Sequence, residues 1–123
     1  MNKINRWTLS CSILLASSCY YDNGEELYGL ATTCDTANVT YSVQITQILS
    51  QNCYQCHGGN AANGAGIKLQ DVNVVKNTVT NGTLLGSVKH LSGYEQMPKN
   101  APKLSTCNIA VIEAWINKGA PIH

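Results

Sequence analysis

Two cysteines and a histidine stand close together in the stretch QNCYQCHGGN, residues 51–60. Cys53 and Cys56 are separated by two residues, and His57 follows directly. Thiolates and an imidazole can bind zinc, and a cysteine pair can form a redox dithiol or a disulfide. The three side chains together can also hold a covalently attached haem. The rest of the chain has to discriminate between these chemistries.

Zinc, dithiol and iron–sulfur chemistry all fit the sequence poorly. A structural zinc site needs four ligands, but there is no second Cys/His pair, and His90 and His123 stand alone. A thioredoxin-type dithiol expects a strand before the motif and a sheet around it, whereas the pattern here is helical. An iron–sulfur cluster needs four cysteines, and the remaining cysteines are far apart and better used as a disulfide.

Covalent haem attachment fits the motif. If a helix continues through it, the two cysteines and His57 stand at i, i+3 and i+4 on one face. Cys53 and Cys56 can then add to the two vinyl groups of a haem, while His57 reaches the iron from one side. We therefore predict haem c as cofactor, with Cys53 and Cys56 as thioether positions and His57 as the proximal iron ligand.

Met97 is the candidate distal ligand of that iron. It lies in an irregular loop, and Pro98 after it removes a backbone donor and fixes the chain direction. A lone methionine is often a filler of core gaps, but Met/His pairs are an established haem arrangement. His90 is the rival ligand; otherwise it ends a helix or bonds a haem propionate.

The pattern of apolar residues predicts an all-α domain of four helices and no strand. The helices are expected over residues 40–53, from Asp71 to Asn81, over 83–90, and from Ser105 to Gly119, with Asp71 and Ser105 as N-caps. The apolar positions of the first, second and last helices are Val43, Ile45, Ile48 and Leu49; Val72, Val75 and Val79; and Ile109, Ile112, Trp115 and Ile116. So small a domain, without phenylalanine, needs a staple or a cofactor to complete its core.

The start of the chain predicts export. Lys3 and Arg6 precede a short apolar run at residues 7–17, which has the layout of a secretory signal peptide and is too short to span a bilayer; a buried helix is the alternative. The letters LLASSC resemble the lipobox of bacterial lipoproteins. We therefore expect a signal peptide at 1–18 and lipidation of Cys19, with ordinary cleavage near Ser18 as the competitor.

Charge and the last two cysteines complete the organisation. Residues 19–38 carry four acidic side chains and no lysine or arginine, which predicts a flexible acidic tether before a domain at 39–123. That domain has six lysines against three acidic residues, a net charge of +3 too dispersed to suggest nucleic acid. Cys34 and Cys107 remain and are expected to form a disulfide in an oxidising compartment; two free thiols are the alternative.

Four stretches together resemble a known family. They are CYQCHGG, GIKLQDVNVVKNTVTNGTLLGSVKH, MPKNAPKLS and IEAWINKGAP. The chain from about residue 41 to 121 is similar to the small single-haem c-type cytochrome modules of Bacteroidetes lipoproteins and to planctomycete-type cytochrome c domains. The resemblance implies a class I cytochrome c-like fold, in which the first and last helices cross around one covalently bound haem. Trp115 would pack at that crossing.

The function implied is one-electron transfer without catalysis. With His57 and Met97 both bound, the iron has no open position, so we expect an electron carrier, anchored by lipid at the bacterial cell envelope, on the periplasmic side or at the outer membrane. Its partners would be a redox protein donor and acceptor, with no nucleic acid, and the protein would be a monomer. Lys89, Lys99 and Lys103 flank the Met97 loop and could steer acidic partners. The alternatives are a pentacoordinate haem enzyme or gas sensor using His90, and a haem-bearing interaction module of a larger complex.

Overall fold

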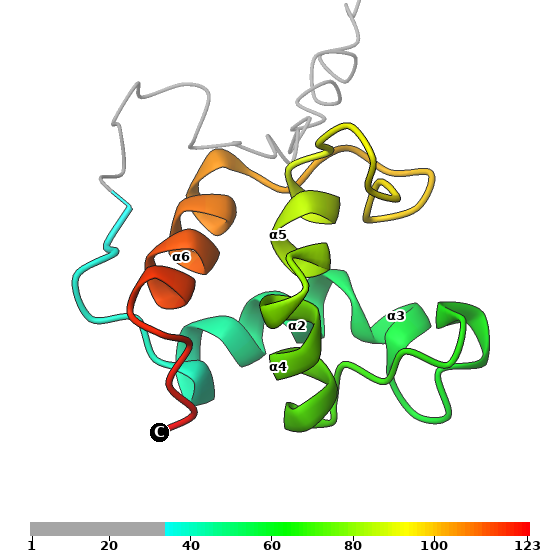
Figure 1. Cartoon of the computed structure of the whole chain (residues 1–123), viewed down its shortest axis with the longest axis horizontal. Helices are drawn as coiled ribbons and strands as arrows, with labels where there is room; N and C mark the ends of the chain where they lie inside the picture. Colours follow the sequence, from blue (N-terminus) through cyan, green and yellow to red (C-terminus); the bar gives the residue numbers. More distant parts are fainter. Residues whose placement is uncertain (1–33) are drawn as a thin grey trace, which may run out of the picture. The chain divides into compact units, whose positions relative to one another are not determined.

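The structure is a computed structural model that describes residues 34–123, and within this range it contains helices and no strand (Figure 1). The expected signal peptide, Cys19 and the tether up to residue 33 lie outside the described residues. The elements in chain order are η1 (Tyr41–Ile45, a π-helix), α2 (Thr46–Asn52), α3 (Tyr54–His57), η2 (Ala62–Gly64, a 3-10 helix), α4 (Val72–Thr80), α5 (Thr83–Val88) and α6 (Thr106–Asn117). The prediction of an all-α domain is confirmed for these residues. No helix in this part of the chain is both long and apolar enough to cross a bilayer.

Both predicted N-caps are confirmed. The Asp71 carboxylate accepts a hydrogen bond from the backbone N–H of Asn73 (2.8 Å) at the start of α4. The Ser105 hydroxyl accepts one from the N–H of Asn108 (3.1 Å) at the start of α6. Each side chain satisfies a donor that the first helical turn leaves without an intrahelical partner. These two local signals therefore located the starts of the second and last helices.

The first predicted helix differs from the structure at both ends. It begins as the π-helix η1, and it is interrupted at Cys53, whose backbone (φ −124°) departs from helical geometry between α2 and α3. Ile45, Ile48 and Leu49 are buried, but Val43 is 59% exposed. Side chains two positions apart on a helix point in directions that differ by about 200°, so Val43 faces away from the buried side on which Ile45 lies. The i, i+3, i+4 set of the sequence pattern, Ile45, Ile48 and Leu49, is thus the buried face of this helix, and Val43 lies outside it.

Trp115 is the centre of the core. It is fully buried, its ring lies 5.6 Å from that of Tyr41 between centroids, and its Nε1–H donates to the carbonyl of Pro121 (2.8 Å). Because Tyr41 begins η1 and Trp115 lies in α6, this pair joins the first and last helical segments, and in Figure 1 α6 lies next to η1. The other large side chains that are fully buried are Ile45, Leu49, Val75 and Ile112.

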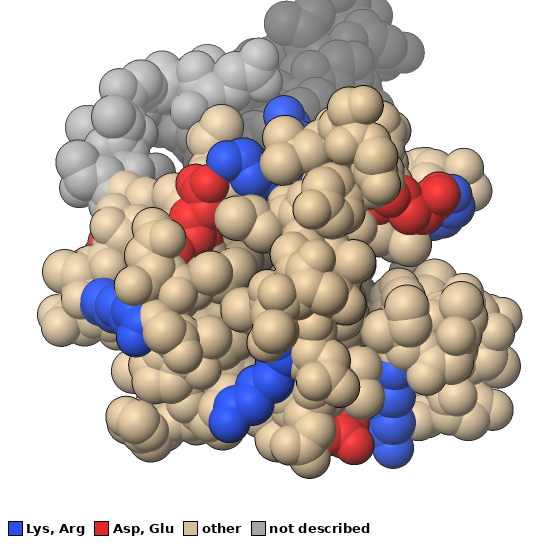
Figure 2. All heavy atoms as spheres, viewed as in Figure 1, with Lys and Arg blue, Asp and Glu red and all other residues tan. Residues whose placement is uncertain are grey.

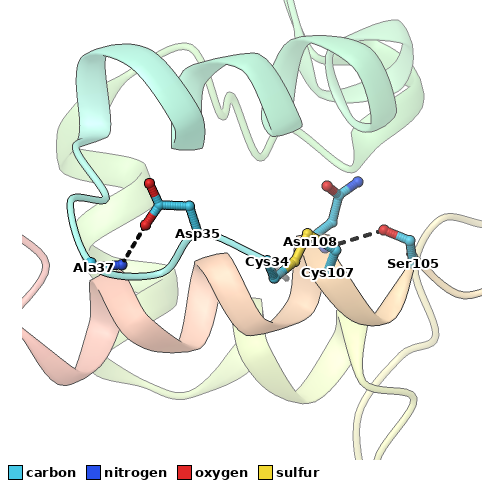
Figure 3. Close-up of a disulfide and its surroundings, with 6 residues drawn as sticks. All are labelled: Cys34, Asp35, Ala37, Ser105, Cys107 and Asn108. Carbon is cyan, nitrogen blue, oxygen red and sulfur yellow. Dashed lines mark hydrogen bonds between the residues drawn. A yellow bond between two sulfur atoms is a disulfide. The ribbon is translucent and has the colours of Figure 1, made fainter. Parts of the chain in front are cut away.

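Residues 34–38, which the sequence assigned to the tether, pack with the folded unit. Cys34 forms a disulfide with Cys107 in the first turn of α6, 73 positions later, with Cα atoms 5.4 Å apart (Figure 3). Asp35 accepts a hydrogen bond from the N–H of Ala37 (2.9 Å), and Lys118 donates to the Ala37 carbonyl (2.5 Å). Residues 34–38 therefore run along α6 and are attached near both of its ends.

Candidate functional site

One helical turn carries the cysteines and the histidine. The Cys53 N–H still donates to Leu49 at the end of α2 (2.8 Å), and the Cys53 carbonyl accepts from both Cys56 N–H (3.1 Å) and His57 N–H (2.8 Å). The helix that leads in ends at Cys53, as its predicted range of residues 40–53 has it, and it does not continue unbroken through the motif, because Cys53 caps a new short helix, α3. The i, i+3, i+4 relation is nevertheless kept, since it depends only on the turn from Cys53 to His57. That turn ends at Gly58.

The ring of His57 is held by the backbone of the following loop. Its Nδ1 lies 2.9 Å from the carbonyl oxygen of Ile67, and the N–H of Leu69 donates to the His57 carbonyl (2.9 Å). Because a carbonyl can only accept, the hydrogen of the neutral ring is on Nδ1, and Nε2 keeps its lone pair. Histidines that bind metals usually donate their second ring nitrogen to such an acceptor. Nε2 is therefore the nitrogen that a neutral His57 could offer to a metal ion.

Gly64, at the end of η2, makes room for that ring. A Cβ atom there would lie 2.5 Å from His57 Nδ1 and 2.7 Å from the Cys56 carbonyl oxygen. Contacts this short do not occur in real structures, so any side chain would displace the imidazole or the α3 turn. Gly64 could not be singled out from the sequence, because its only signal is its place in the glycine-rich stretch after the motif, which is equally typical of an ordinary loop.

The two motif cysteines are free thiols in different surroundings. Cys53 is partly buried and packs against the core, whereas Cys56 is exposed. Burial raises the pKa of the Cys53 thiol to about 11. The pKa of Tyr54 is also raised, mainly by burial and to a smaller extent by the charge of the nearby Cys53 thiolate. A thiol with so high a pKa is protonated at neutral pH, which is the opposite of what a redox or thiolate-ligand cysteine requires.

Met97 belongs to a separate segment whose backbone is attached to α5. The Met97 N–H donates to the carbonyl of Ser87 (3.1 Å), and the Met97 carbonyl accepts from the Nε2–H of His90 (3.0 Å). The residue is half-buried. In Figure 1 the Met97 loop and α3 lie toward the same side of the domain, and the surface between them is indented in Figure 2. The structure thus brings Cys53, Cys56 and His57 onto one turn and Met97 onto a loop facing the same side.

A cavity of about 590 Å³ lies within the loop that follows α5. Its walls come from residues 90–102 and include His90, Tyr94 and Pro102, but none of the three motif residues. The hollow is open to solvent and is formed by this loop alone.

Two of the three lysines near this loop are paired. Lys89 bonds Glu113 of α6 (2.5 Å), and Lys99 pairs with Glu95 within the loop. Lys103 is exposed and has no hydrogen-bond or ion-pair partner among residues 34–123. Steering by these lysines stays a prediction, and Lys103 is the residue on which it now depends most.

Comparison of the chain with protein families, with curated proteins and with solved structures finds no match. The case for a function therefore depends on the site itself.

Proposed function

We propose that this chain is a single-haem c-type cytochrome that carries one electron at a time. The observation that carries the proposal is the α3 turn, on which Cys53 and Cys56 are free thiols and His57 offers Nε2 because its Nδ1–H is used by Ile67. A bound haem would supply an iron that alternates between the ferrous and ferric states. The residues fit that group, since Gly64 leaves the imidazole the space it needs and the thiols have no other partner in residues 34–123.

The rival chemistries of the motif are less well supported. Among residues 34–123, no three side chains of His, Cys, Asp or Glu converge as metal ligands would, although Cys53, Cys56 and His57 are adjacent in sequence. A zinc site would need them to point at one centre with a fourth ligand. A redox dithiol would need a thiol of lowered pKa, but that of Cys53 is raised. Attachment of the thiols to separate positions of one porphyrin requires neither condition.

Met97 would serve as the second axial ligand. Its backbone is fixed at both polar groups, so the thioether is presented from a defined place in a loop that otherwise lacks regular structure. With both axial positions filled by protein, the iron would have no position for a substrate. This supports an electron carrier rather than an enzyme.

The rival five-coordinate haem enzyme or gas sensor finds less support. It would use His90 as a ligand or as a distal acid–base group. His90 Nε2 is already bonded to the Met97 carbonyl, so this role would require the loop to open first.

Cellular placement is part of the same proposal. A haem domain lipidated at Cys19 and joined by an acidic tether would be held at the bacterial envelope, where several acyl chains on one cysteine give stable attachment. The tether would let the domain reach a donor and an acceptor while raising their effective concentration. Redox proteins of the envelope are therefore the proposed partners.

An absorption spectrum of the exported protein tests the proposal. We expect a covalently bound haem that stays with the denatured chain, a weak far-red band from Met97–iron ligation in the oxidised state, and little binding of carbon monoxide. The variants Met97→Ala and His57→Ala separate the two ligands, since only Met97→Ala should lose the far-red band while His57 stays on the iron. Absence of covalent haem would overturn the proposal, and a haem that binds carbon monoxide readily without the far-red band would favour the sensor.

A further inference from the structure

His90 occupies a position at which an L-residue is unusual. It follows the last turn of α5, where the N–H of Leu91 donates to Gly86 (2.9 Å) and the N–H of His90 donates to Ser87 (3.2 Å). This pair of bonds is the Schellman termination of a helix, and it puts His90 at the position that glycine most often fills. The backbone of His90 has φ +56°, in the left-handed region. Glycine would adopt that conformation without strain, so the imidazole needs another explanation.

The side chain of His90 makes a bond that glycine could not make. Its Nε2–H donates to the carbonyl of Met97 seven positions later (3.0 Å), while the Met97 N–H donates to Ser87 (3.1 Å). Both polar backbone groups of Met97 are thus fixed to the end of α5, one by the helix and one by His90. His90 thus combines a left-handed backbone conformation with a side-chain hydrogen bond to the loop.

Packing holds this loop to α5 at Tyr94, whose ring lies so close to Gly86 that a Cβ there would be 2.4 Å from it, but most of the loop is exposed. Residues 91–96 and 99–103 are all exposed, and the cavity of about 590 Å³ lies within the loop. Exposed segments with few apolar contacts open at low free energy, and their hydrogen bonds then decide how often they do so. The bond from His90 is the one side-chain hydrogen bond that reaches Met97 among the described residues.

We infer that His90 is a positioning residue that keeps the Met97 thioether over the iron by holding the Met97 carbonyl. This inference rests on the proposed function, because it concerns the residue proposed as distal ligand. In this role His90 supports Met97 as the iron ligand and does not compete with it for the iron. If the hydrogen bond from His90 to the Met97 carbonyl breaks, Met97 would leave the iron more often, and an external ligand could bind there.

Two glycine variants test this with matched backbone effects. His90→Gly removes the strained left-handed residue and the bond to Met97 together. Asn100→Gly removes a residue of the same φ (+56°) from the same loop, and its side chain has no hydrogen bond in the described structure. His90→Gln keeps an N–H donor and should rescue in part.

The expected differences are spectroscopic. A hydrogen bond between neutral groups changes an equilibrium by about five-fold. In His90→Gly, Met97 should therefore be dissociated from the iron about five-fold more often. The far-red band of the oxidised protein should be weaker, and the reduced protein should bind carbon monoxide faster. Hydrogen exchange at the Met97 amide should rise by a similar factor, a readout that does not depend on the iron. Asn100→Gly should resemble the wild type.

The outcomes separate this inference from the proposed function. Absence of covalent haem in the wild type would overturn the proposed function and this inference with it. A far-red band and amide exchange unchanged in His90→Gly, in protein that carries haem, would overturn this inference alone. If the wild type lacks the far-red band and His90→Gly loses its second axial ligand, then His90 itself binds iron and the positioning role is refuted.

Discussion

His57 owes its orientation to backbone groups on both sides of its ring. The Ile67 carbonyl bonds Nδ1, and Gly64 lies so close that no Cβ fits beside the imidazole. Fixing the tautomer and the ring plane before a ligand arrives removes ordering that binding would otherwise have to supply. The loop after the motif is thus as much a part of the site as the motif itself.

Replacing Gly64 by alanine should therefore damage the site. The new methyl group would lie 2.5 Å from Nδ1, and overpacking of this kind costs about 1–3 kcal/mol. We expect a lower thermal midpoint and a reduced yield of covalent haem. Asn63→Ala is the control, because Asn63 is the neighbouring residue of η2 and is exposed. Equal haem yield and stability in both variants would show that His57 does not depend on the space at Gly64.

The contact between η1 and α6 joins the two ends of the folded unit. The rings of Tyr41 and Trp115 lie 5.6 Å apart and are inclined by 34°. Burial first, then the charges that Tyr54 and Asp71 carry when ionised, raise the pKa of the Tyr41 phenol above its ordinary value of 10.0. The neutral phenol is thus favoured in the folded state.

The raised pKa of Tyr41 predicts that the folded state loses stability at alkaline pH. Because the folded pKa exceeds the unfolded one, the contribution of Tyr41 is fully present below pH 10 and is lost as the pH rises through the folded pKa. Tyr41→Phe keeps the ring and cannot ionise, so its denaturation midpoint should fall less steeply above pH 10 than that of the wild type. Parallel curves for the two proteins would show that the phenol ionises equally in both states.

Local sequence signals predicted the helices whose ends carry caps. Asp71 and Ser105 marked α4 and α6 because a cap uses only neighbouring residues. The π-turn of η1 and the break at Cys53 have no such signal, so the sequence pattern did not indicate them. The motif identified Cys53, Cys56 and His57 by type and spacing.

The supporting residues of the site could not be predicted in the same way. Gly64 acts through a close approach to His57, and His90 through a bond to a residue in another segment. Both depend on how loops fold back onto helices, and the sequence pattern does not encode that distance. Residues proposed to bind a cofactor directly are therefore easier to find from sequence than those that hold them in place.

At the scale of the molecule, the disulfide joins the start of the described chain to its last helix. Closing a loop of 73 positions should stabilise the fold by about 4 kcal/mol through the entropy of the unfolded chain. We expect the double variant Cys34→Ser, Cys107→Ser to unfold at lower denaturant, and reductant to destabilise the wild type but not the variant. Identical midpoints for wild type with and without reductant would contradict this contribution.

On the face of the domain shown in Figure 2 the lysines are scattered, and several of them lie beside acidic groups. Near the Met97 loop, Glu113 offsets the charge of Lys89 and Glu95 offsets that of Lys99, whereas Lys103 has no such partner in residues 34–123. Steering of an acidic partner to this side of the domain should therefore depend on Lys103. Two unit charges roughly 10 Å apart in water interact by about 0.4 kcal/mol, which corresponds to about a two-fold change in rate.

Lys103→Gln should accordingly slow electron exchange with an anionic redox complex by about two-fold at low ionic strength, and the difference should vanish at high salt as charges are screened. The double variant Glu95→Gln, Lys99→Gln leaves the local charge unchanged and should exchange at the wild-type rate. Lys76→Gln on α4 makes the same change in net charge away from the loop. If Lys76→Gln slows exchange as much as Lys103→Gln, then net charge alone sets the rate, and the Met97 side is not where electrons enter and leave.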